Sequence, residues 1–247
     1  MSGEATGKTV AIILSRMTSS RLPGKALTDI CGKPNLQFMI ERVRQAKYLD
    51  EICVATTTNS TDDPIADICL TLGIPVYRGD EDDVLDRTIR AAEQLTATAI
   101  VRLTADCPMI DPSLIDETID AFHADDCDYA SNGHVRSYPD GMDTEVVSYQ
   151  ALVRADKEAH HPFLREHVTP YIRASHPQYG SGEFKIRNVV YEADFSSVRW
   201  TLDTPQDLVI IQKLCAKLPE GFTWLQALAM AINEPELLNI KPHHVKF

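Results

Sequence analysis

The sequence predicts an α/β fold in which a doubly wound, mostly parallel central sheet lies between two layers of helices, with a small β-rich insertion. Two observations predict this class. Short apolar runs alternate with segments of helical period from residue 10 to residue 122. Polar loops separate these segments, as expected where crossover helices join parallel strands. Ligands of such sheets bind at the carboxyl ends of the strands, so the loops there form the candidate site.

The first half of the chain contains the alternating strands and helices. Its first strand is Val10–Leu14, five apolar residues in succession. Asp111 before Pro112 indicates a helix start, because Asp favours the N-cap and Pro the first turn. The other strands are expected at Glu51–Thr57, Pro75–Arg78 and Ala99–Leu103, and the helices at Asn35–Ala46, Pro64–Leu72, Val84–Leu95 and Pro112–Phe122.

The second half is less regular. Thr204, Pro205 and Asp207 indicate another helix start, with a capping box. Strand-like pieces are expected within Asp128–Ser148, at Phe184–Val190 and at Val198–Leu202, and helices at His161–Ser175 and Thr223–Ile232. We find no linker, repeat or low-complexity tract in the sequence, so residues 1–247 are predicted to form one domain, with residues 1–8 as a loose tail.

Composition restricts the function. The 247 residues include 36 Asp and Glu against 24 Lys and Arg, and a net charge of -12 argues against nucleic-acid binding. The sequence has no apolar run of the roughly 18 residues that a membrane helix needs and no signal-peptide core, so we expect no membrane association and a cytoplasmic location. Six cysteines without a C-x-x-C pair are predicted to be reduced thiols, most of them in the core.

A basic loop follows the first strand and is the strongest candidate for a binding site. It carries Arg16, Arg21 and Lys25, and the sequence has no acidic residue from position 5 to position 28. Positive charge without neighbouring carboxylates suits a polyanion. A solvated basic turn would explain any one of these residues alone, but the combination favours a binding site.

Two later segments finish in the pattern Asp-x-Pro, at Asp106 and at Asp203. If each follows a parallel strand, both carboxylates emerge at the same sheet edge as the basic loop. Carboxylates facing Arg and Lys suit Mg²⁺ carrying a nucleoside triphosphate. Each Asp could instead only cap the helix that follows. The His pairs at 160–161 and 243–244 have no carboxylate or Cys at ligand spacing in the sequence, so neither is predicted to bind metal.

Motifs spread from residue 15 to residue 207 resemble those of the cytidylyltransferases that make CMP-activated sugar acids, closest to the branch named for spore-coat polysaccharide biosynthesis. The N-terminal signature is Ser15-Arg16, then Ser20-Arg-Leu-Pro-Gly-Lys25, then Ile30-x-Gly-Lys-Pro34. The later matches are Gly79-Asp-Glu-Asp-Asp-Val-Leu-Asp-Arg87, Leu103-Thr-Ala-Asp-Cys-Pro108, Asp140-Gly-Met-Asp143-x-Glu145-Val, Arg165-Glu-His-Val-Thr-Pro170 and Leu202-Asp-Thr-Pro-Gln-Asp207.

The resemblance implies a Rossmann-like nucleotidyltransferase fold and an Mg²⁺-dependent transfer of CMP from CTP to an anionic acceptor, with release of pyrophosphate. It also implies a homodimer, as in the related sugar-acid enzymes. The residues implied for the nucleotide are Leu14, Ser15, Arg16, Arg21, Lys25 and Arg87, with Lys25 and Arg21 also catalytic, and those implied for the metal are Asp106 and Asp203. For Asp203, metal binding and helix capping both stay open.

Four residues are the candidates for the acceptor: Asp143, Glu145, Arg165 and His167. Alternate spacing places Asp143 and Glu145 on one face of a strand. Arg165 could bind a carboxylate or phosphate bidentately, and His167 could act as an acid, a base or a hydrogen-bond donor. A solvated helix face is the alternative for Arg165 and His167. Residues 128–190 are expected to form an acceptor-side and dimerisation elaboration.

Two positions depart from the family pattern: Ala105 stands where many relatives have Gly, and Ser15 where many have Ala. A glycosyltransferase that uses nucleotide-sugars is the alternative enzyme, and its Asp-x-Asp motif would be Asp80-Glu81-Asp82, which leaves the basic loop unexplained. The non-enzymatic alternative is a degenerate regulatory subunit. Such a subunit would be expected to have lost a metal Asp or the loop Lys, and this sequence keeps all of them. Transfer to a phosphate or phosphonate metabolite stays open, and the sequence does not identify the acceptor.

Overall fold

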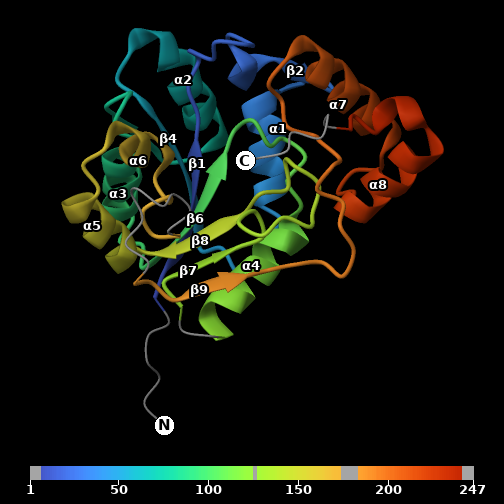
Figure 1. Cartoon of the computed structure of the whole chain (residues 1–247). Coiled ribbons are helices and arrows are strands. Elements are labelled where there is room, and N and C mark those ends of the chain that lie inside the picture. The colour runs from blue at the N-terminus through green and yellow to red at the C-terminus, as the bar shows by residue number, and fades with distance from the viewer. Residues whose placement is uncertain (1–6, 125–126, 174–182, 241–247) are drawn as a thin grey trace.

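The computed structural model describes residues 7–124, 127–173 and 183–240, and a seven-stranded sheet runs through its centre (Figure 1). The strand order is β5-β4-β1-β6-β8-β7-β9. The bounds are β1 Thr9–Leu14, β4 Glu51–Thr57, β5 Val76–Gly79, β6 Ala99–Thr104, β7 Tyr129–Ser131, β8 Glu145–Ser148 and β9 Ile186–Asn188, and a separate hairpin pairs β2 Asp29–Ile30 with β3 Lys33–Pro34.

The sheet is parallel from β5 through β4 and β1 to β6, and β8 is antiparallel to both of its neighbours, β6 and β7. The helices are α1 Asn35–Val43, α2 Asp63–Leu72, α3 Val84–Gln94, α4 Pro112–Ala124, α5 Tyr149–Glu158, α6 Pro162–His167, α7 Pro205–Lys217 and α8 Trp224–Asn233. This confirms the doubly wound α/β class with a mostly parallel sheet. Residues of β7 to β9 form the β-rich insertion.

Each face of the sheet is covered by its own helices because side chains alternate along a strand. In β1, Ala11 and Ile13 pack in one core cluster with α1, α2 and α4, whereas Val10 and Ile12 pack in a second cluster with α3, α5 and α6. A third cluster gathers around Trp200 and includes residues of α7 and α8, which lie together at the far side from α3 and α5 (Figure 1).

Helix starts follow the predicted capping signals. Pro112 begins α4, and Thr204 and Asp207 form a capping box at the start of α7. β4 has the bounds expected from the sequence. No helix of the described residues is long and apolar enough to cross a bilayer.

The second half differs from the expectations in three places. The helix α5 was not predicted, because it begins directly after β8, where Ser148 caps it. The helix expected at His161–Ser175 ends at His167, because the next residue, Val168, has φ 68°. The segment 198–202 forms only single bridges, since its buried residues serve the third cluster rather than a ladder.

Lys8 does not belong to a loose tail, contrary to expectation. Residues 1–6 lie outside the described part of the chain, as do residues 243–244 of the second His pair. Lys8 is held at the sheet: its carbonyl accepts hydrogen bonds from the backbone of Thr98 and Ala99, and its ammonium pairs with Glu51 at 2.5 Å. Among the cysteines, Cys31 is exposed rather than part of the core, because it forms the β2–β3 turn with φ 52°.

Candidate active site

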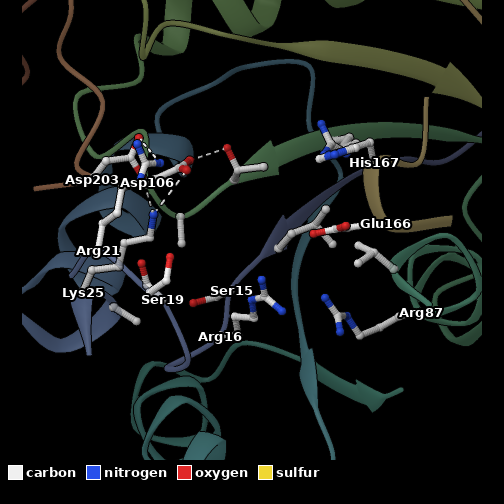
Figure 2. A pocket seen from close by; sticks show the side chains of 17 residues that line it. Ser15, Arg16, Ser19, Arg21, Lys25, Arg87, Asp106, Glu166, His167 and Asp203 are labelled. Atoms are coloured by element: carbon white, nitrogen blue, oxygen red, sulfur yellow. Dashed lines mark hydrogen bonds and ion pairs between the residues drawn. The ribbon is translucent and has the colours of Figure 1, made fainter. Parts of the chain in front are cut away.

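A cleft of about 370 Å³ opens at the carboxyl ends of β1 and β6, and Figure 2 shows its lining. The basic loop after β1 forms one wall, and the segment after β6 forms another. The polar and charged lining residues are Ser15, Arg16, Ser19, Ser20, Arg21, Lys25, Arg87, Arg102, Thr104, Asp106, Glu166, His167 and Asp203. Leu14 also lines the cleft, so the structure brings every residue implied for the nucleotide and metal to one place.

The backbone of the basic loop is fixed by hydrogen bonds. Ser15 N donates to Ala55 O at 3.2 Å, which extends the β1–β4 ladder by one residue. Met17 N donates to Asp62 Oδ1 at 2.8 Å, and Met17 O accepts from Gly24 N at 2.9 Å. Gly24 has φ 73°, a conformation that glycine adopts without strain, and a short 3-10 helix, η1 (Lys25–Leu27), begins after it. The loop therefore returns Lys25 to the cleft.

Lys25, Asp106 and Asp203 meet at one end of the cleft (Figure 2). Lys25 Nζ lies 3.3 Å from Asp106 Oδ2 and 3.1 Å from Asp203 Oδ1. Arg21 Nη2 lies 3.0 Å from Asp203 Oδ2. Burial opposes ionisation of Asp106, but Lys25 and the Thr104 hydroxyl outweigh it, so the pKa of the Asp106 carboxyl lies below its usual value.

Asp203 reaches this point although no ladder strand precedes it. Leu202 N donates to Asp106 O at 2.7 Å, which aligns the two Asp-bearing segments. Arg199 holds Asp203 from behind, with Nη2 2.7 Å from Asp203 Oδ2 and Nη1 2.5 Å from Asp207 Oδ1. Asp207 also accepts hydrogen bonds from the backbone of Asp203 and Thr204. Asp203 therefore faces the cleft, and the capping of α7 falls to Thr204 and Asp207.

The donor set fits a divalent cation that is carried by a phosphate ligand. Two carboxylates, Asp106 and Asp203, converge on one cation, the Lys25 ammonium, which shows that they can share a positive charge. The described residues contain no group of three or more His, Cys, Asp or Glu that could enclose a metal. Mg²⁺ is usually held by one or two carboxylates together with phosphate oxygens and water.

The opposite end of the cleft is lined by Arg16, Arg87 and Glu166 (Figure 2). Arg87 is buried, and its Nη1 donates to Asp80 O at 2.7 Å, while its Nε has no hydrogen-bond partner among the described residues. Arg16 Nη1 lies 3.2 Å from Glu81 Oε1. The guanidinium groups of Arg16 and Arg87 therefore line the same cleft as Leu14 and Ser15.

A second pocket of about 160 Å³ adjoins the cleft. Arg102, Thr104 and His167 line both, so the two pockets lie side by side and share these residues. The other residues of the second pocket are Gly133, Arg136, Asp143, Glu145 and Arg173. Three arginines therefore surround this pocket, which is built largely by the insertion.

The two acids of the second pocket are engaged with its arginines. Glu145 is buried, accepts a hydrogen bond from Arg102 and lies 3.6 Å from Arg173 Nη1, and Tyr129 and Thr169 also donate to it. Burial opposes its ionisation, but the two arginines outweigh it, so the pKa of Glu145 lies below the usual value. Asp143 pairs with Arg136 at 2.7 Å, yet burial raises the pKa of the Asp143 carboxyl.

Arg165 does not reach either pocket, contrary to its predicted contact with the acceptor. Its Nη2 lies 2.6 Å from Asp83 Oδ2 and its Nη1 2.7 Å from Asp156 Oδ1. The side chain therefore ties α6 to the start of α3 and to α5. His167, two residues later, lines both pockets.

The sequence did not indicate Arg102, Arg136, Arg173, Glu166 or Arg199 as site residues. For two of them a signal existed: Arg102 lies between Val101 and Leu103 within β6, and Arg199 lies between Val198 and Trp200. A charge inside an apolar run is uncommon, and burial of an arginine requires partners. Arg173 and Arg136 lie in irregular segments and had no such signal.

Comparisons with known proteins indicate the family. The protein family described as "Cytidylyltransferase" matches this chain over residues 10–229. The spore coat polysaccharide biosynthesis protein SpsF of Bacillus subtilis (strain 168) is 35% identical over 214 residues, 85% of this chain and 87% of its own. A 3-deoxy-manno-octulosonate cytidylyltransferase of Geobacter sulfurreducens is 40% identical over 111 residues, 44% of this chain and 43% of its own.

A solved structure supports the same grouping. The structure of a cytidylyltransferase from Leptospira borgpetersenii serovar Hardjo-bovis superposes with a TM-score of 0.89 and 29% identity, over 96% of this chain and 99% of that one. With the family description matching most of its length, the chain belongs to the cytidylyltransferase family.

Proposed function

We propose that this cytidylyltransferase transfers CMP from CTP to a small anionic acceptor, a sugar acid or a related precursor of surface polysaccharide, and releases pyrophosphate. The observation that carries the proposal is the junction of the two pockets at Arg102, Thr104 and His167. A triphosphate in the first pocket and an acid in the second would place an acceptor oxygen beside the α-phosphate. The names of the relatives, which refer to spore coat polysaccharide and to an octulosonate, support this acceptor class.

The nucleotide would occupy the cleft along the basic loop. Its nucleoside would bind near Leu14, Ser15, Arg16 and Arg87, and its triphosphate near Arg21 and Lys25. A divalent metal, which we take to be Mg²⁺, would be held by Asp106 and Asp203 and would supply positive charge against the triphosphate. As the acceptor oxygen bonds to the α-phosphorus, the bond to the pyrophosphate oxygen breaks, and Arg21 and Lys25 offset the charge of the leaving group.

The second pocket would bind the acid. Arg102, Arg136 and Arg173 present guanidinium groups, which suit a carboxylate or phosphate. Glu145 and Asp143 would orient these arginines rather than bind the acceptor directly, because both already pair with them. Burial lowers the pKa of the His167 imidazole, so it is neutral near pH 7 and able to accept the proton of an attacking hydroxyl.

A screen of pyrophosphate release tests the proposal. Each of the four nucleoside triphosphates is incubated with Mg²⁺ and a panel of sugar acids, phosphosugars and phosphonates. Release that requires CTP together with a sugar acid supports the proposal, and release with a phosphosugar or phosphonate alone would transfer the assignment to that acceptor class. Release with none of the panel would contradict cytidylyl transfer to a small anion.

The glycosyltransferase alternative gains little from the geometry. Glu81 accepts hydrogen bonds from Arg16, Thr18 and Asn59, and the Asp80 carboxylate accepts from the backbone of Asp82 and Asp83. These carboxylates stabilise the turn and the basic loop. A homodimer and a cytoplasmic location stay part of the proposal, and sedimentation velocity and cell fractionation test them.

A further inference from the structure

The Lys25 ammonium is a cation that Asp106 and Asp203 share. Besides its contacts with the two carboxylates, Lys25 Nζ donates to Leu202 O at 3.3 Å. Its side chain is 15% exposed, although it belongs to a loop with mostly accessible residues. The ammonium is thus drawn inward, away from the open part of the cleft.

The oxygens of both carboxylates are engaged in this arrangement. Asp203 Oδ1 pairs with Lys25, and Asp203 Oδ2 pairs with Arg21 and Arg199. Asp106 Oδ2 pairs with Lys25, and Asp106 Oδ1 accepts from the Thr104 hydroxyl at 2.6 Å. A divalent cation that approached these oxygens would meet an ammonium group already in contact with them, and like charges repel strongly where water is largely excluded.

A triphosphate in the cleft would offer the Lys25 ammonium a second set of partners. Lys25 is the first residue of η1, and its flexible four-carbon stem lines the same cleft as Arg21 and the serine hydroxyls of the loop. An ammonium group is a compact charge whose partners can be exchanged by rotation of that stem. Phosphate oxygens would replace the carboxylates as its partners.

We propose that Lys25 is an exchangeable counter-ion: it neutralises Asp106 and Asp203 in the free protein and leaves them for the triphosphate when nucleotide and metal arrive. This inference rests on the proposed assignment of Asp106 and Asp203 to the metal. It follows that the free protein binds divalent metal weakly, and that metal and nucleotide each increase the affinity for the other.

The exchange of Lys25 for metal is tested directly by titrating the protein with Mn²⁺ in the absence of nucleotide. The electron paramagnetic resonance signal of free Mn²⁺ measures how much metal is bound. Lys25→Met keeps most of the stem but removes the charge, and we expect it to bind Mn²⁺ at least about tenfold more tightly than the wild type. Lys33→Met is the matched control, because that half-buried lysine pairs with Glu41 outside the cleft, and it should leave the affinity unchanged. Adding Asp106→Asn to Lys25→Met should remove the gain.

Circular dichroism verifies that each variant is folded, and Lys25→Gln replaces Lys25→Met if the latter does not fold. Equal Mn²⁺ affinity in the wild type and the folded Lys25 variant would overturn the exchange. A separate experiment tests the proposed metal site. Binding of a non-reactive α,β-methylene analogue of CTP is measured with and without Mn²⁺, and the metal site is wrong if Asp106→Asn leaves the effect of Mn²⁺ on this binding unchanged. The two results can therefore be told apart.

Discussion

At the scale of residues, Asp203 shows how one carboxylate is aimed by several cations. Lys25 and Arg21 approach it from the cleft, and Arg199 from the protein interior. Arg199 is in turn fixed by Asp207 and lies 3.6 Å from Asp140. The side chain of Asp203 therefore has little freedom to turn away from the cleft, and the proposed role in metal binding requires such a fixed orientation.

Asp106→Asn keeps the shape of the side chain but removes one of the two charges that would hold the metal. We expect turnover to fall about 10²-fold or more, roughly 3 kcal/mol of transition-state stabilisation, together with a weaker response to Mg²⁺. Steady-state rates across an Mg²⁺ titration measure both effects. Asp67→Asn, on the exposed surface of α2, is the control. A normal Mg²⁺ titration in Asp106→Asn would remove this residue from the metal site.

Arg173 is the arginine of the second pocket with the weakest internal partners. Its Nη1 lies 3.6 Å from Glu145, and its buried Nε has no hydrogen-bond partner among the described residues. Arg173→Met should raise the acceptor KM about tenfold or more and leave the CTP KM nearly unchanged, because only one substrate loses a contact. Kinetics with each substrate varied in turn measure this, with Arg90→Met on the surface of α3 as control. A rise confined to the CTP KM would place Arg173 with the nucleotide instead.

At the scale of elements, the short helix α6 carries His167, which lines both pockets, and Glu166, which lines the first. Glu166 and His167 come from its last turn, and the strained φ of Val168 directs the chain back into the core. Six residues cannot hold a helix in place by their own hydrogen bonds. Arg165 supplies an attachment, since its guanidinium bridges Asp83 at the N-cap of α3 and Asp156 in α5.

Removal of this attachment should affect stability before it affects binding. Arg165→Ala leaves two carboxylates without their partner, and we expect the free energy of unfolding to fall by about 1–3 kcal/mol. Urea denaturation measures the loss, and a double-mutant cycle with Asp83→Ala should show coupling between the two residues. Arg90→Ala, which removes exposed pairs on α3, should change stability little. Additive effects in the cycle would contradict the bridge.

At the scale of the molecule, the sequence predicted the parallel half of the fold well because its signals are local. Apolar runs, capping residues and Asp111-Pro112 each act within one element, and β4 matches its expected bounds. The strands of the insertion lie within the segments expected from the sequence, but their bounds were not predicted, since these short strands are defined by pairing with β6 and with one another rather than by their own pattern. The site divides in the same way: Lys25 and Asp106 follow strands, whereas Arg173 acquires a role only through Glu145, which is distant in the sequence.

Acid should destabilise the whole molecule through its buried carboxylates. Burial opposes ionisation of Asp62, but hydrogen bonds from Thr57, Met17 and Thr56 outweigh it, so its pKa lies below the ordinary 3.8. The pKa of Glu145 likewise lies below 4.5. Carboxyls with a lowered pKa in the folded state contribute stability above their unfolded pKa, and this contribution is lost as the pH falls. The free energy of unfolding should therefore decline below about pH 4.5.

Two variants give opposite changes in that decline. Asp62→Asn removes a group whose pKa is lowered, so the acid loss should become shallower. Asp143→Asn removes a group whose pKa is raised by burial, and which therefore loses its contribution as the pH rises, so the net acid loss should become steeper. Urea denaturation between pH 7 and pH 3.5 measures both slopes. Equal slopes for the two variants would contradict the opposite pKa shifts of Asp62 and Asp143.

The antiparallel direction of β8 has a consequence for how this enzyme could change its substrate over evolutionary time. β8 begins beside the end of β6, with Glu145 opposite Arg102, so the segment leading into β8 arrives at the edge where the parallel strands finish. The parallel strands and their loops line most of the cleft proposed for the nucleotide, whereas the insertion contributes most of the second pocket. Mutation, lengthening or replacement of the insertion could thus change which acid binds, while the parallel strands and their loops are inherited unchanged. Arg102, Thr104 and His167 line both pockets and would have to suit both substrates.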